Sequence, residues 1–147
     1  MWIVENIPND SAVYVRIHET FISSKDKLPK SAAFSNTPKE GDNLSCDWDK
    51  HCTPESAREL IGKQLKKDGS FKDHNLFFMW EMNVGKIRKE INPKQLVEHQ
   101  PIENDPEIVG APNNRAHSII IGDKQINNAE FRVSILKLGK WAIPPKI

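Results

Sequence analysis

The sequence predicts an α+β fold: a single domain over residues 1–147, with a mixed or mostly antiparallel sheet and one or two helices packed on one face. Three observations support this prediction. The length of 147 residues is typical of one domain. Four Trp and six Phe supply enough large side chains for a core. Candidate strands outnumber candidate helices and do not alternate with them regularly, which disfavours a doubly wound parallel sheet.

The first strand is expected at residues 13–18, where β-branched and polar residues alternate. Successive side chains of a strand point to opposite faces of the sheet. The apolar set would therefore face the core, and the polar set would share the other face: Val13, Val15 and Ile17 against Tyr14, Arg16 and His18.

Residues 23–43 are rich in Ser, Lys, Pro, Asn and Gly and predict a loop around one short strand at residues 32–34. A strand at residues 44–48 follows. It leads into a helix from Thr53 to Lys67, in which Thr53 is the N-cap and a proline occupies the first helical position. Four apolar residues form one stripe of this helix, and Gly69 ends it: Ala57, Leu60, Ile61 and Leu65.

Residues 76–82 are apolar apart from Glu81, which is typical of a strand buried on both faces, and the strand can extend as far as Ile91. Two shorter strands are expected at residues 96–99 and 117–121. Residues 127–139 predict a second helix, because Asn127 with Glu130 resembles a capping box. Alternation of Phe131, Val133 and Ile135 leaves a strand open as the alternative there.

The charge balance disfavours a nucleic-acid partner. The chain has 21 basic and 20 acidic residues, a net charge of +1, whereas nucleic-acid binders carry a clear basic excess.

The longest apolar run, residues 76–80, is too short to cross a bilayer, so no membrane partner is expected. The first residues lack the basic and apolar regions of a signal peptide, and the expected location is the cytoplasm. No phosphate or dinucleotide motif occurs, so no cofactor is expected.

Residues 46–52, Cys-Asp-Trp-Asp-Lys-His-Cys, bring several metal-ligand types together. On an extended segment Asp47, Asp49 and His51 would point the same way. The gap between Cys46 and Cys52 is longer than the usual zinc-ligand spacing, and no second ligand pair follows. We therefore expect no metal here, and reduced thiols.

Several expected strands carry polar residues with catalytic potential. If these residues converge on one face of the sheet, they build a pocket with a histidine as acid or base: Arg16, His18, Ser45, His99 and His117. The alternative is that each histidine is a hydrogen-bonded structural residue in its own strand.

Residues 100–114 form a long segment without a strand or helix pattern. Loops of this length are typically functional or disordered. Its acids favour a basic protein partner and its apolar residues can anchor the contact, so the expected partner-binding residues are Ile102, Glu103, Asp105, Glu107, Ile108 and Val109. The alternative is a disordered insert with no role.

The order of several short motifs resembles a family of small uncharacterised bacterial proteins. The motifs are Arg16-Ile17-His18, Ala33-Phe34, Leu44-Ser45-Cys46-Asp47, His99-Gln100-Pro101 and Asn114-Arg115-Ala116-His117, with a longer insert between the last two. The resemblance implies a small cytoplasmic bacterial accessory protein. With no catalytic motif recognised, the first function expected is that of a non-enzymatic protein-binding module.

A second, more distant resemblance favours an enzyme. An arginine on an early strand and Leu44-Ser45 on a later one look like the dinucleotide-binding half of ADP-ribosyltransferases. This implies a nucleotide-handling transferase as the alternative function. The catalytic glutamate of that family would have to be Glu81 or Glu130.

Overall fold

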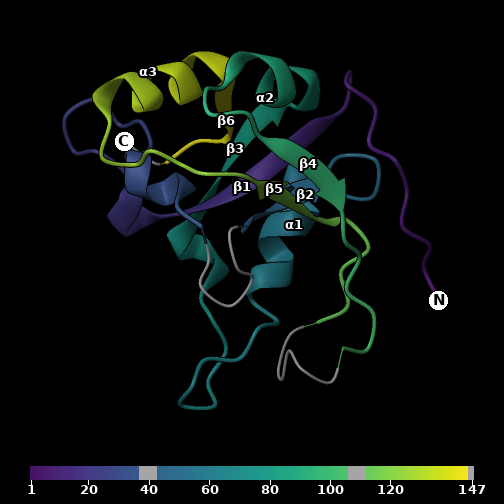
Figure 1. Ribbon diagram of the computed structural model, residues 1–147. Coiled ribbons are helices and arrows are strands. Elements are labelled where there is room, and N and C mark those ends of the chain that lie inside the picture. Colours follow the sequence, from purple (N-terminus) through teal and green to yellow (C-terminus); the bar gives the residue numbers. More distant parts are fainter. Residues whose placement is uncertain (37–42, 106–111, 146–147) are drawn as a thin grey trace.

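The structure is a computed structural model that describes residues 1–36, 43–105 and 112–145. Six antiparallel strands form one sheet in the order β4-β5-β2-β1-β3-β6 (Figure 1). The strands are β1 (Ala12–His18), β2 (Asn43–Trp48), β3 (Phe77–Asn83), β4 (Leu96–His99), β5 (His117–Ile121) and β6 (Gly139–Ile143). The helices are α1 (Pro54–Ile61), α2 (Val84–Glu90) and α3 (Ala129–Leu138). The predicted α+β class is confirmed.

Helices cover both faces of the sheet. Helices α2 and α3 lie together on one face, and α1 lies on the opposite one (Figure 1). The larger apolar core is between the sheet and α2 and α3, and includes Val15, Ile87 and Phe131. A smaller cluster joins Ala57 of α1 to Tyr14 and Met79. The two helices predicted from the sequence, α1 and α3, therefore lie on opposite faces rather than on one. The face of α3 is shared with α2, which the sequence did not indicate.

Strand β1 alternates as its sequence predicts. Val13, Val15 and Ile17 are at most 1% exposed and belong to the larger core. Tyr14 is also buried, but on the α1 face, where it packs in the smaller cluster. Arg16 shares that face because residues two apart on a strand point the same way.

Helix α1 begins as predicted but ends earlier. The Thr53 side chain accepts a hydrogen bond from the Ser56 amide, and the Ser56 side chain accepts one from the Thr53 amide, which forms a capping box. The predicted extension to Lys67 is wrong, because the helix ends at Ile61. The chain then forms a short hairpin in which Leu65 pairs with Phe71, turning at Gly69 with φ +87°.

Three other boundaries differ from the prediction for local reasons. Strand β3 does not extend to Ile91, because the Asn83 side chain accepts a hydrogen bond from the Lys86 amide and starts α2. Residues 31–34 form a 3-10 helix instead of a short strand. The second predicted helix is confirmed as α3, and its N-cap is Asn128, one residue later than expected.

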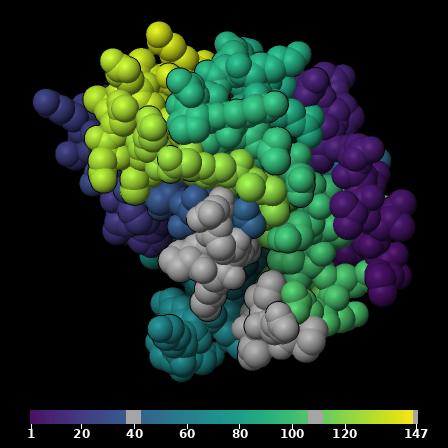
Figure 2. All heavy atoms as spheres, viewed as in Figure 1, coloured from purple at the N-terminus to yellow at the C-terminus, as the bar shows by residue number. Residues whose placement is uncertain are grey.

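The N-terminal segment runs along one side of the molecule, beside the residues that lead out of β4 (Figure 2). The Trp2 amide donates to Glu103 Oε1 at 2.6 Å, and Ile7 is buried in the larger core. Among the described residues, no helix has the length and apolar character needed to cross a membrane.

Candidate functional site

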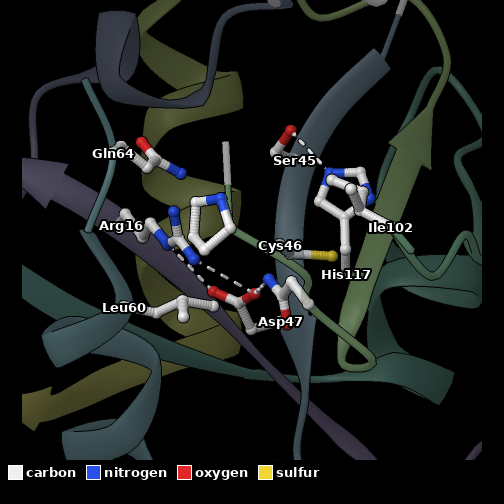
Figure 3. Close-up of a pocket in the computed structure, with 10 residues that line it drawn as sticks. Arg16, Ser45, Cys46, Asp47, Leu60, Gln64, Ile102 and His117 are labelled. Carbon is white, nitrogen blue, oxygen red and sulfur yellow. Dashed lines mark hydrogen bonds and ion pairs between the residues drawn. The ribbon is translucent and has the colours of Figure 1, made fainter. Parts of the chain in front are cut away.

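Three of the five predicted catalytic residues line one cavity. Arg16, Ser45 and His117 come from β1, β2 and β5 and line the cavity on the α1 face of the sheet, with Arg16 on one side and the other two residues together on the other (Figure 3). The cavity has a volume of about 110 Å³. Leu60 of α1 and Ile102 of the loop after β4 supply its apolar wall.

The cavity lies where two central strands stop pairing. Strands β1 and β2 are in register only at Val13–Trp48 and Tyr14–Asp47, so the cavity begins directly beyond these pairs. On its other side, β2 pairs with β5 from Asn43 to Asp47, with Asp47 opposite His117. Directly opposed residues share a face, and this pairing carries Ser45 and His117 to the same side.

Ser45 and His117 form a hydrogen-bonded pair. Ser45 Oγ lies 3.2 Å from His117 Nε2, and His117 Nδ1 lies 2.8 Å from the Gln100 carbonyl oxygen. A carbonyl oxygen only accepts, so Nδ1 carries the proton and donates it to Gln100. In the neutral ring Nε2 is then the acceptor, and Ser45 donates its hydroxyl proton to it. This arrangement has the form of a nucleophile and its base.

Arg16 is held by a buried acid beside that pair. Its Nε lies 3.0 Å from Asp47 Oδ2, and Asn114 Nδ2 donates to Asp47 Oδ1 at 2.8 Å. Asp47 is 2% exposed and the Arg16 side chain 20%. Among the described residues, hydrogen bonds of the guanidinium run from Nε and Nη2 to Asp47, and none involves Nη1. The guanidinium is therefore fixed at the cavity with donor capacity left.

Gln64 adds a second donor that the sequence did not indicate. Its Oε1 accepts a hydrogen bond from Lys72 Nζ at 3.1 Å. Because an ammonium group only donates, this contact assigns the amide oxygen to Lys72 and turns the NH₂ group towards Arg16 (Figure 3). Gln64 follows the last residue of α1. Because the helix ends at Ile61 and not at Lys67, Gln64 lies in the segment after the helix and reaches the cavity.

The other two predicted residues lie elsewhere. His18 is at the end of β1, where its Nδ1 accepts from the Thr20 amide and its ring contacts Phe77 edge-on. His99 lies on β4 and points to the opposite face of the sheet, where its ring contacts Trp48. Alternation along β4, with Val97 in the larger core, explains this direction.

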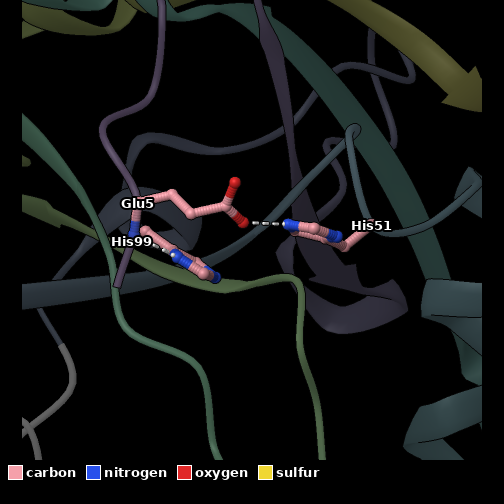
Figure 4. A group of neighbouring side chains, drawn as sticks. All are labelled: Glu5, His51 and His99. Atoms are coloured by element: carbon pink, nitrogen blue, oxygen red, sulfur yellow. Dashed lines mark hydrogen bonds and ion pairs between the residues drawn. The ribbon is translucent and has the colours of Figure 1, made fainter. Parts of the chain in front are cut away.

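His99 belongs to a second polar cluster, with Glu5 and His51 (Figure 4). Glu5 Oε2 lies 2.6 Å from His51 Nε2, and the Glu5 amide donates to His99 Nδ1 at 3.0 Å. Hydrogen bonds from Lys50 and His51 lower the pKa of Glu5 to about 2, so the carboxylate is ionised. The sequence did not single out Glu5, because it is 94 residues away from His99 along the chain.

The side chains of residues 46–52 that could bind a metal point in different directions. Asp47 faces the cavity, whereas His51 faces Glu5 after the turn that ends β2. Cys46 is in the larger core, and Cys52 Sγ donates to the Trp48 carbonyl. In the part of the chain that the structure describes, these two cysteines form no disulfide. Burial raises the pKa of the Cys52 thiol to about 12.

The described residues of the predicted binding loop form hydrogen bonds with neighbouring segments of the chain. Ile102 pairs with Asn114 through two backbone hydrogen bonds and lines the cavity. Glu103 accepts from the Trp2 amide, and Asp105 is exposed. The remaining predicted contact residues lie outside the described residues: Glu107, Ile108 and Val109.

Neither glutamate proposed for transferase chemistry lines the cavity. Glu81 is on β3, 3.6 Å from Lys140 Nζ. Glu130 is in the first turn of α3, on the opposite face of the sheet. Among the described residues that line the cavity, the carboxylate is Asp47, which Arg16 and Asn114 already engage.

Comparison with known proteins finds no family model, curated protein or solved structure that matches this chain, so its function has to be argued from the geometry of its own residues.

Proposed function

We propose that this protein is a hydrolase that acts on small acyl esters, with Ser45 as the nucleophile and His117 as the general base. One observation carries the proposal: the hydrogen-bonded series Ser45 Oγ, His117 Nε2, His117 Nδ1 and the Gln100 carbonyl, with its serine end in a cavity. A base that is itself oriented by a third group is the recurring arrangement of nucleophilic catalysis.

The chemistry follows from the protonation of His117. Ser45 Oγ attacks the ester carbonyl carbon while His117 Nε2 takes the hydroxyl proton. The same nitrogen then gives that proton to the leaving alcohol oxygen as the carbon–oxygen bond breaks. Water, deprotonated by His117, attacks the acyl-serine, and the proton returns to Ser45 as the acid leaves. Arg16 and the Gln64 amide supply donors for the developing oxyanion.

The size and charge of the cavity restrict the substrate. A volume of about 110 Å³ is well below the roughly 300–1,000 Å³ of sites for drug-sized ligands, and it suits a short acyl group. Arg16 adds a fixed positive group, since guanidinium binds carboxylate well. The proposed substrate is therefore a short-chain ester with a nearby anionic group.

A nucleotide-handling transferase receives less support from the same geometry. Arg16 and Ser45 do lie together, as that resemblance implies. However, the cavity is small for a dinucleotide, and neither Glu81 nor Glu130 reaches it. Within residues 1–36, 43–105 and 112–145, no glutamate lines the cavity to serve a transferase, whereas Ser45 and His117 supply the nucleophile and the base for ester hydrolysis.

The experiment is covalent labelling of the purified full-length chain with a fluorophosphonate probe, read by intact mass and peptide mapping, alongside hydrolysis of p-nitrophenyl acetate. We expect one adduct, on Ser45, because the probe reports a serine activated by a base. Ser45→Ala should abolish both signals. His117→Gln should slow both by about 100-fold or more, which is the typical contribution of a general base.

Ser118→Ala is the matched control. Ser118 is the neighbour of His117 on β5, but it is fully buried and donates to the Ala116 carbonyl, away from the cavity. This variant should keep labelling and hydrolysis. Absence of an adduct on Ser45, together with hydrolysis equal to that of Ser45→Ala, would reject the proposal.

A surface feature favours a second candidate function, binding of a protein partner. Ile3 and Val4 are 73% and 72% exposed, and the segment that carries them is joined to the long loop by the Trp2–Glu103 hydrogen bond. Exposed apolar side chains beside acids suit a partner with an apolar and basic surface. The loop residues predicted from the sequence would extend this surface.

A further inference from the structure

We propose that Glu5, His51 and His99 bind a divalent transition-metal ion, with zinc as the expected ion. The cluster lies on the face of the sheet opposite the cavity of Ser45 and His117 and shares no residue with it. The proposal therefore stands or falls separately from the proposed hydrolase.

The donor atoms suit such an ion. Two imidazole nitrogens and one carboxylate oxygen lie within 4.8 Å of one another. Two histidines and one carboxylate form a known ligand set for zinc that leaves a fourth position for water. The same set with open positions also binds iron(II).

His99 is oriented as metal-binding histidines are. Its Nε2 lies 2.7 Å from the Arg115 carbonyl oxygen and must donate to it. Its Nδ1 therefore presents a lone pair to the cluster (Figure 4). A ligating imidazole almost always has its second nitrogen hydrogen-bonded in this way. At 3% exposure the ring is also shielded from water.

The Glu5 carboxylate is also oriented by a residue outside the proposed ligand set. Lys50 Nζ contacts Oε1, while Oε2 faces His51 Nε2 at 2.6 Å. An outer hydrogen bond to the second oxygen is common for a carboxylate that binds a metal through the first. His51 stacks on His99 with ring centroids 5.6 Å apart, and Trp48 contacts both rings edge-on. Packing therefore limits the movement of both rings.

Binding requires two local shifts and the loss of the His51 Nε2 proton, which now donates to Glu5 Oε2. The Glu5 amide now donates to His99 Nδ1 at 3.0 Å, and an ion would take that lone pair. Bond lengths of about 2.0–2.2 Å also require Glu5 and His51 to separate slightly. Glu5 lies before β1, outside every strand of the sheet, and its neighbours Ile3 and Val4 are largely exposed, so a shift of Glu5 breaks no strand pairing. The competing explanation is a clasp that uses hydrogen bonds alone.

The test is titration of the chelator-treated full-length chain with Co²⁺, followed by displacement with Zn²⁺. We expect one equivalent of Co²⁺ to give the visible absorption bands of a four- or five-coordinate ion, and Zn²⁺ to remove them. Outer hydrogen-bond partners typically change metal affinity about 10–100-fold. Loss of a direct ligand in His51→Ala should therefore lower affinity by at least about 100-fold.

Further variants keep the test decisive. Glu5→Gln retains the size of the side chain and should also weaken binding, whereas His18→Ala, at the end of β1, should not. If His99→Ala fails to fold, His51→Ala and Glu5→Gln still answer the question, since both residues are partly exposed. Absence of the Co²⁺ bands, or equal binding by both variants and wild type, would show a hydrogen-bonded clasp and overturn the proposal.

Discussion

Single residues on the α1 face combine burial with charge. Asp47 is an ionisable side chain in the middle of the sheet at 2% exposure. A buried charge is tolerated where it is paired and hydrogen-bonded, and Arg16 and Asn114 supply both conditions. The result is a donor at the cavity whose position is set by two hydrogen bonds to Asp47. The ion pair is better understood as a positioning device than as a source of stability, since desolvation offsets much of its attraction.

Tyr14 gives the first prediction, because it is the single tyrosine of the chain. Burial, with a smaller contribution from the Glu81 charge, raises its pKa to about 12 from an ordinary value of 10.0. The folded state therefore keeps a proton that the unfolded state releases. Stability from this residue is complete below about pH 10 and declines as pH rises towards about 12.

The measurement is a tyrosinate difference spectrum in the near ultraviolet. Native protein should show little ionisation at pH 10 to 11, while denatured protein titrates near about 10. Tyr14→Phe removes the signal and should weaken the loss of stability in that pH range. A native midpoint equal to that of the denatured chain would contradict the burial of this hydroxyl.

At the scale of elements, the C-terminal end of α1 is set by hydrogen bonds of the following hairpin. The periodic spacing of apolar residues in the sequence does not predict these hydrogen bonds. The apolar stripe extends to Leu65, yet the helix ends at Ile61. The following residues instead close a hairpin in which the Lys66 amide donates to the Ser70 carbonyl and Asp68 accepts from the Ser70 amide. This change of direction places Gln64 at the cavity rather than on a helix surface.

A pair of substitutions tests that helix end. Ile61 is 1% exposed and Leu65 is 42% exposed. Ile61→Ala should lower the free energy of unfolding by about 2–4 kcal/mol, since it leaves a cavity in the core. Leu65→Ala should change it by only about 0.5 kcal/mol. Urea denaturation of both variants gives the comparison, and a similar cost for the two would show that the helix continues past Ile61.

The same elements show what a sequence can predict. Strong local patterns identified β1, β3, β5 and α1, because burial on one or both faces imposes a period on the residues themselves. Residues 31–34 and the end of β3 were missed, because side-chain caps and local backbone hydrogen bonds decided them. Residues 106–111 lie outside the described residues, so the role predicted for them stays a prediction.

At the scale of the whole molecule, strand order decides which residues meet. Ser45 and His117 are 72 residues apart and pair because β2 and β5 are neighbours. His99 and His117 lie on adjacent strands yet face opposite sides, so two polar clusters form instead of one. The sequence could nominate Arg16, Ser45 and His117, but their convergence depends on a strand order that local patterns do not contain. Gln64 and Glu5 had no signal of their own.

The last prediction concerns the loop that joins β4 to β5 and its role in partner binding. Replacing residues 105–111 by two glycines removes four of the six predicted contact residues, Asp105, Glu107, Ile108 and Val109. It keeps the pairing of Ile102 with Asn114 and the contact of Asn104 with Asn113. Because closure entropy depends weakly on loop length, the free energy of unfolding should change by only about 0.5 kcal/mol.

Partner capture should fall sharply in this shortened variant, and also in Ile3→Ser/Val4→Ser, because both remove part of one surface. Quantitative cross-linking and affinity capture from a cell extract measures this, with circular dichroism to verify the fold. Lys66→Ala/Lys67→Ala is the control, since these exposed residues lie in the hairpin after α1. Unchanged capture by the folded, shortened variant would reject the loop as a binding element. Loss of capture in the lysine control as well would show that the contact is not confined to the N-terminal segment and the loop.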